Sequence, residues 1–177
     1  MKKTLVVVVV GFIFITSLGL RAAGDEEGVV TQFDGGIGVQ PVLINATTFA
    51  ATANVVRGIV PGLLPWTIHS LKAAVGLDGD IRVRGRGLVL AGGPPIGTRG
   101  DLGSVRALLF CGTSTTPSVS PAGALDVDGD FTIDGVLTPA IGPDCPTPTL
   151  LIVVGAGTAQ APFRWIAAGI PDNDDHR

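Results

Sequence analysis

Glycine and proline recur at short intervals along this chain, and their spacing is the feature that most limits the folds open to it. The 177 residues include 26 glycines and 13 prolines. Glycine weakens a helix and proline breaks it, so an α-helix needs a long stretch without either. Beyond residue 24, no window of about 12 residues combines a helical period with capping residues. We therefore expect short strands joined by turns, built from abundant valine, isoleucine, leucine and threonine.

The candidate strands follow one another closely from residue 53 to residue 170. They lie near residues 55–60, 66–68, 70–76, 80–90, 104–111, 122–126, 130–138, 149–154 and 163–168. With about seven or eight of these ranges forming strands, the pattern predicts an all-β fold, an antiparallel β-sandwich that is Ig-like or similar. We expect this domain over 53–170, a loosely structured lead-in over 25–52, and a disordered polar tail over 171–177.

The first 24 residues have the pattern of a secretory signal peptide. Two lysines precede an apolar run over 5–15, and Ala22-Ala23-Gly24 stand directly before three acids. This pattern predicts cleavage after Gly24 and secretion of a soluble chain to an extracellular or periplasmic location. The alternative is an uncleaved membrane anchor, because residues 4–20 reach the lower limit of length for a bilayer span.

Cleavage would also make the protein more acidic. The removed segment carries three of the 12 basic residues and none of the 15 acids, which leaves a net charge of about −6. Nucleic-acid binding needs a basic surface that neutralises phosphates. We therefore expect no nucleic-acid partner.

Two similar hairpins are predicted around Asp78-Gly79 and Asp128-Gly129. A two-residue turn at either Asp-Gly would set apolar side chains opposite charged ones. A three-residue loop with left-handed glycine avoids this conflict, because Val75 then faces Ile81 and Ala73 faces Val83. The same register pairs Leu125 with Phe131, and Gly123 with Ile133.

The predicted register also places three arginines, Arg82, Arg84 and Arg86, in a row on one face of a strand. Guanidinium groups bind sulfate, phosphate and acidic sugars, so the row is a candidate anion-binding site. The favoured interpretation is a solvated strand face whose arginines pair with the acidic residues Asp126, Asp130 and Asp134.

Three alternating carboxylates, Asp126, Asp128 and Asp130, resemble the start of a calcium-binding loop. An EF-hand needs glycine at its sixth position and glutamate at its twelfth, where this chain has Phe131 and Leu137. A plain turn is expected, a calcium site of another kind is the alternative, and no other cofactor is predicted.

The two cysteines, Cys111 and Cys145, are predicted to form a disulfide, because an exported protein meets oxidising conditions. A crosslink between residues so far apart stabilises a fold by roughly 3 to 4 kcal/mol in the chain-entropy model. The alternative is a reactive thiol, but neither cysteine has a histidine close by in the sequence.

Signatures of catalysis are missing from the sequence. It has two histidines, His69 and His176, and neither a Gly-x-Ser-x-Gly elbow nor a phosphate-binding glycine loop. We expect Trp66 and Trp165 in the core rather than on a sugar-binding surface. The sequence therefore predicts a protein that is not an enzyme.

Several strand patterns resemble a group of small secreted bacterial proteins with two cysteines. The resemblance rests on Leu64-Pro65-Trp66-Thr67-Ile68, Gly87-Leu88-Val89-Leu90, the cysteine pair and Arg164-Trp165-Ile166-Ala167. It covers about residues 55–170 without a sharp motif. The resemblance implies export and a β-sandwich, and it brings no activity and no site residues.

Together these patterns favour a secreted or cell-envelope protein of structural or interaction type. Its partner would be an envelope or extracellular protein or a glycan, and it would contact a membrane only through an uncleaved signal segment. The alternative function is a ligand-binding module, which would hold calcium at the aspartates or an anionic glycan at the arginine row.

Overall fold

The structure is a computed structural model that describes residues 28–172, and this part of the chain is all-β, without helices. The predicted signal peptide and the end of the predicted tail lie outside the described residues. The long strands are β1 (Val29–Gly38), β6 (Ser70–Gly76), β7 (Asp80–Arg86), β9 (Ser104–Phe110), β12 (Phe131–Val136), β13 (Thr149–Val154) and β14 (Arg164–Pro171). The short strands are β2 (Val42–Ile44), β3 (Ala51–Ala53), β4 (Val60–Pro61), β5 (Trp66–Thr67), β8 (Val89–Leu90), β10 (Ser118–Val119) and β11 (Gly123–Ala124).

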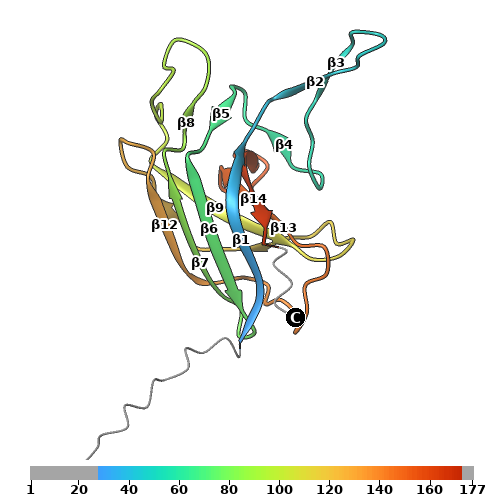
Figure 1. Ribbon diagram of the computed structural model, residues 1–177, viewed down its shortest axis with the longest axis vertical. Coiled ribbons are helices and arrows are strands. Elements are labelled where there is room, and N and C mark those ends of the chain that lie inside the picture. The colour runs from blue at the N-terminus through green and yellow to red at the C-terminus, as the bar shows by residue number, and fades with distance from the viewer. Residues whose placement is uncertain (1–27, 173–177) are drawn as a thin grey trace, which may run out of the picture.

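One sheet of ten strands forms the body of the protein (Figure 1). Its strand order is β10-β9-β13-β14-β1-β6-β7-β12, with β11 beside β9 and β4 beside β14. Along that path every neighbouring pair is antiparallel, and β4 runs parallel to β14. Two further sheets have two strands each, β2 with β3 and β5 with β8.

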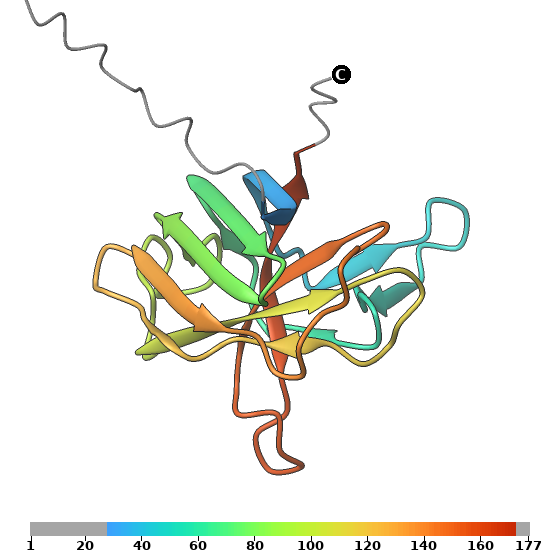
Figure 2. The same cartoon turned by 90° about the horizontal axis from the view of Figure 1, so that it is seen from below.

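The large sheet is curled like a half-barrel, as Figure 2 shows from below. Its two ends approach each other where Val119 in β10 and Thr138, just beyond β12, exchange backbone hydrogen bonds of 2.8 and 2.9 Å. The predicted all-β, antiparallel character is confirmed, but the predicted β-sandwich is not. Register shifts in β1 and β13 act as bulges, which bend strands and let a single sheet curl over its own core.

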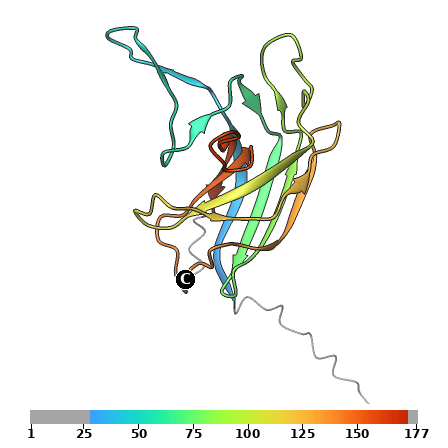
Figure 3. The same cartoon turned by 180° about the vertical axis from the view of Figure 1, so that it is seen from behind.

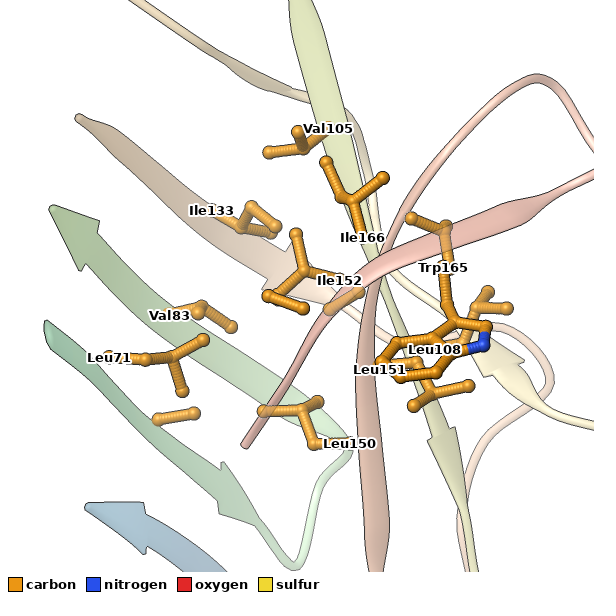
Figure 4. Packing of buried hydrophobic residues seen from close by; sticks show 14 of the residues in the cluster. Leu71, Val83, Val105, Leu108, Ile133, Leu150, Leu151, Ile152, Trp165 and Ile166 are labelled. Atoms are coloured by element: carbon orange, nitrogen blue, oxygen red, sulfur yellow. The ribbon is translucent and has the colours of Figure 1, made fainter. Parts of the chain in front are cut away.

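The core lies on the inner side of this curl. Alternation along β7 turns Ile81 and Val83 inward and the arginines outward. Consecutive residues of β13 from Leu150 to Val153 are buried, so both faces of this strand are covered. Figure 4 shows side chains from opposite parts of the curl meeting, among them Leu71, Val83, Ile133 and Ile152. Trp66 and Trp165 are buried, as predicted.

The first predicted hairpin is confirmed residue by residue. Val75 pairs with Ile81 and Ala73 with Val83, and Gly79 in the loop has a φ of 84°. That positive φ is what requires glycine at this position. The three-residue loop therefore keeps the apolar side chains of β6 and β7 on one face.

The second hairpin is confirmed at its tip, where Leu125 pairs with Phe131, and is wrong beyond it. Gly123 pairs with Val105 in β9 instead of Ile133 in β12. A side chain on Gly123 would overlap the backbone of Thr132, so glycine lets β11 cross closely over β12. Between β11, which pairs with β9 near one end of the sheet, and β12, which forms the other end, the chain passes from one end of the sheet to the other.

Candidate interaction and binding sites

The arginine row stands on the outer face of the curled sheet. Arg82, Arg84 and Arg86 are exposed, because their neighbours along β7 take the inward positions. Lys72 in β6 and Thr132 in β12 lie on either side of Arg84, and Asp134 in β12 lies beside Arg82. The sheet thus places the predicted anion-binding residues beside one another and beside an acid.

Two exposed ion pairs neutralise part of this face. Arg82 Nε lies 3.6 Å from Asp134 Oδ2, and Lys72 Nζ lies 2.8 Å from Asp34 Oδ2 in β1. The hydrogen bond and charge of Asp34 raise the pKa of Lys72. Exposed pairs of this kind contribute little to stability. Of the three acids expected to pair with the arginines, Asp134 alone lies within ion-pair distance among the described residues.

An open depression of about 480 Å³ lies beside the other two arginines. Arg84, Arg86 and Thr132 line it, together with Asp126 and Asp130. In the described part of the chain, neither arginine has a carboxylate within 4.0 Å. The depression therefore offers two guanidinium groups to a ligand, with two carboxylates lining it as well.

The predicted calcium residues form a tight turn. Asp126 Oδ1 accepts hydrogen bonds from the backbone nitrogens of Asp128, at 3.0 Å, and Asp130, at 2.8 Å. Asp130 Oδ1 accepts one from Gly87 at 2.9 Å. Two of the three carboxylates thus fix backbone, a common role of aspartate in turns. Within residues 28–172 no three His, Cys, Asp or Glu residues are grouped to hold a metal ion, and the calcium site stays a prediction.

The disulfide between Cys111 and Cys145 is confirmed. Their Cα atoms are 4.7 Å apart, although 34 positions separate them in the sequence. Cys111 directly follows β9 and Cys145 shortly precedes β13, and these two strands are neighbours in the sheet. The crosslink therefore closes the long connection between two core strands.

A feature that sequence reasoning missed is the hairpin β2–β3. Figures 1 and 3 show it projecting from one end of the sheet. Val42, Leu43, Ile44 and Phe49 are 53%, 52%, 57% and 79% exposed. The sequence marks this segment as unusual, because residues 35–56 carry no charged side chain. An uncharged apolar segment would ordinarily be expected inside a core.

Local hydrogen bonds shape the tip of this hairpin. Asn45 Oδ1 accepts bonds from the backbone nitrogens of Thr47 and Thr48, both at 2.9 Å. The backbone nitrogen of Phe49, which has a left-handed φ of 56°, donates to Asn45 O at 2.8 Å. Strands β2 and β3 pair with each other alone. Each therefore keeps one outer edge without a neighbouring strand in the described part of the chain.

The described residues contain no helix long and apolar enough to cross a membrane. No protein-family model, curated protein or solved structure matches the chain. What the protein does must therefore be inferred from its own residues.

Proposed function

We propose that this protein is a non-catalytic interaction protein of secreted or cell-envelope type, which associates with a second copy of itself through hairpin β2–β3. The observation that carries this proposal is the exposure of Val42, Leu43, Ile44 and Phe49 on one projecting hairpin. Removing apolar surface from water is favourable by about 25 cal/mol for each Å², and an association gains what remains after the costs of ordering the two partners. A group of exposed apolar side chains marks a surface that another molecule covers.

The distribution of charge supports a second copy of this chain as the molecule that covers the hairpin. The chain has a formal net charge of −3 at pH 7, so two copies repel each other wherever their acidic surfaces meet. Residues 35–56 carry no charge, so two hairpins meet without that repulsion. The free outer edges of β2 and β3 also support a second copy as the partner, because an exposed strand edge pairs with another strand through its backbone groups. An antiparallel pair of identical strands also satisfies the twofold symmetry of a dimer.

The proposed location outside the cytoplasm rests on the disulfide. Paired cysteines persist in the periplasm and outside the cell, whereas the cytosol keeps most thiols reduced. The Cys111–Cys145 pair is compatible with either location. A fusion to a periplasmic reporter, with and without residues 1–24, tests the proposed export signal directly.

Sedimentation of the purified protein over a range of concentrations tests the self-association. We expect a reversible dimer, and Leu43→Lys should weaken it at least about tenfold, because the change places like charges opposite each other in the interface. Val127→Lys is the matched control, since Val127 is 73% exposed in the β11–β12 turn. A protein that stays monomeric at all concentrations, or equal effects of both variants, would contradict the proposal. A thermal melt shows that each variant is folded.

Binding of an anionic glycan is the second candidate function. The observation that favours it is the pair Arg84 and Arg86, which line one depression without a carboxylate within 4.0 Å among the described residues. With a heparin oligosaccharide as probe, Arg84→Gln and Arg86→Gln should each weaken binding. Arg82→Gln should have a smaller effect, because Asp134 already holds that guanidinium. Equal binding by all three variants would contradict a site at the depression.

A further inference from the structure

An apolar cavity of about 320 Å³, open to the surface, lies at the end of the sheet near β5 and β8. Trp66, Leu90 and Ile166, which are buried core residues from β5, β8 and β14, contribute to its lining. Leu64, Leu102 and Val154 from the surrounding loops and the end of β13 contribute as well. The elements that meet here lie below the loop that follows β8, at the upper end of the molecule in Figure 1.

Two arginines also line this apolar cavity. Arg99 Nη1 donates to the backbone oxygen of Leu102, and Arg164 Nη1 donates to that of Pro61 at 3.3 Å. These bonds fix each side chain and leave its positive charge without a carboxylate within 4.0 Å in the described part of the chain. Asp101 is the one acid that lines the same cavity, and it is exposed. The cavity therefore carries a net positive charge.

The buried indole of Trp66 adds a third hydrogen-bond donor. Its Nε1 donates to no described residue, in contrast with Trp165, whose Nε1 donates to the backbone oxygen of Asn54 at 2.8 Å. Among the described residues, every fully buried side-chain nitrogen or oxygen has a hydrogen-bond partner. Because Trp66 Nε1 has none, this atom is not fully buried and is accessible to solvent or a ligand. Such a donor, on a residue that lines the same cavity as the two arginines, suits a ligand oxygen.

We infer that this cavity binds a small amphipathic anion, a carboxylate with an aliphatic body. The apolar residues would cover the body, and Arg99 and Arg164 would hold the carboxylate. A volume of about 320 Å³ has room for a short aliphatic chain that ends in a carboxylate. Binding sites typically combine such an apolar lining with a few placed polar groups. This site is separate from hairpin β2–β3 and goes beyond the proposed self-association.

Calorimetric titration of the purified protein with octanoate, a short-chain member of this class of anions, tests the inference. Octylammonium is the matched probe, with the same body and the opposite charge. We expect saturable binding of octanoate, and octylammonium at least about tenfold weaker, because a charge-assisted hydrogen bond contributes a factor of about ten or more. Arg99→Gln and Arg164→Gln should each weaken octanoate binding by a similar factor. Arg106→Gln is the control, since Arg106 donates to Ser120 O at 2.9 Å and does not line the cavity.

A substitution at an exposed lining residue tests the same site if an arginine variant is unstable. Leu64 is 37% exposed, so Leu64→Asp should fold, and its carboxylate should abolish octanoate binding without blocking octylammonium. Ile96→Asp, at a 62% exposed position outside the lining, should change neither. The inference is overturned if octanoate shows no saturable binding, if octylammonium binds equally well, or if the arginine variants match Arg106→Gln. Leu43→Lys should leave octanoate binding unchanged, which separates this site from the hairpin.

Discussion

Strand β7 and the hairpin β2–β3 place apolar side chains in opposite environments. In β7, apolar residues or glycine alternate with charged residues, and each apolar side chain is buried. In β2, three consecutive apolar residues are all exposed. Phe33 in β1 is 2% exposed, whereas Phe49 in the hairpin is 79% exposed. The same residue type is therefore core in one region and surface in the other.

The difference lies in the number of neighbours that each strand has. β7 has β6 on one side and β12 on the other, and its inward face packs on the core. The hairpin has one contact between its own strands, and isolated hairpins are marginally stable in water. At its base, Asn54 Nδ2 donates to Gln40 O at 3.0 Å and joins the two ends of the hairpin, and Trp165 Nε1 in β14 donates to Asn54 O and ties the hairpin to the large sheet. Its apolar surface thus remains available for association.

The largest difference between the two regions is expected when their phenylalanines are truncated. Phe33→Ala should destabilise the protein by about 3 to 5 kcal/mol, because it opens a cavity in the core. Phe49→Ala should change stability by less than about 0.5 kcal/mol, because little of its surface is buried. Urea unfolding at a concentration that keeps the protein monomeric measures both. Similar losses in the two variants would show that the hairpin packs like the core.

Removing the disulfide measures how much the crosslink contributes to the free energy of unfolding of the packed region. The double substitution Cys111→Ser and Cys145→Ser should cost roughly 3 to 4 kcal/mol, because the unfolded chain gains the freedom of an open loop. Thermal melts of the variant and of the reduced wild type give the loss. The hairpin contains no crosslink, so we expect sedimentation of the folded variant to show unchanged self-association. Loss of the dimer in a folded variant would contradict the separation of the two regions.

The glycines of the two three-residue loops separate two effects within the packed region, backbone conformation and close approach of neighbouring atoms. Gly79→Ala should cost roughly 1 to 2 kcal/mol, because its φ of 84° is left-handed, while its Cβ would meet only Val136 Cγ1 at an ordinary contact distance of 3.8 Å. Gly129→Ala should cost more, since its Cβ would lie 2.5 Å from the carbonyl oxygen of Leu88. Chemical denaturation compares the two variants. Equal losses would show that backbone conformation alone determines the effect.

The smallest expected effect concerns the exposed pair Lys72–Asp34 on the outer face. Asp34 raises the pKa of Lys72 above its ordinary value of 10.5. A raised lysine pKa adds stability below pH 10.5, which is lost as pH rises through the folded-state value. NMR titration of Lys72 Nζ should therefore show its pKa fall towards the ordinary value in Asp34→Asn. An identical titration curve in the two proteins would contradict the contact.

Local patterns predicted the parts of the fold that depend on neighbouring residues. The alternation in β7, the three-residue loop at Gly79 and the pairing of Leu125 with Phe131 all follow from side-chain period and turn chemistry. The crossing of β11 from β12 to β9 was not predictable, because it depends on the space that Gly123 leaves beside Thr132. The three arginines lie on one face of β7, as predicted. The apolar cavity was not predicted, because its lining residues come from segments that are far apart in the sequence.

Residue patterns were enough to predict the long strands after residue 66, the inward and outward faces of β7, the loop geometry of β6–β7 and the pairing of the two cysteines, but not β1 or the hairpin β2–β3. Only the complete fold shows that β1 lies between β14 and β6, that the large sheet is curled, and that β2–β3 stays outside it. The physical reason is that side-chain alternation is written into each strand, whereas backbone hydrogen bonds are alike for all strands. Which distant strands become neighbours depends on how the complete set of apolar faces closes over a single core.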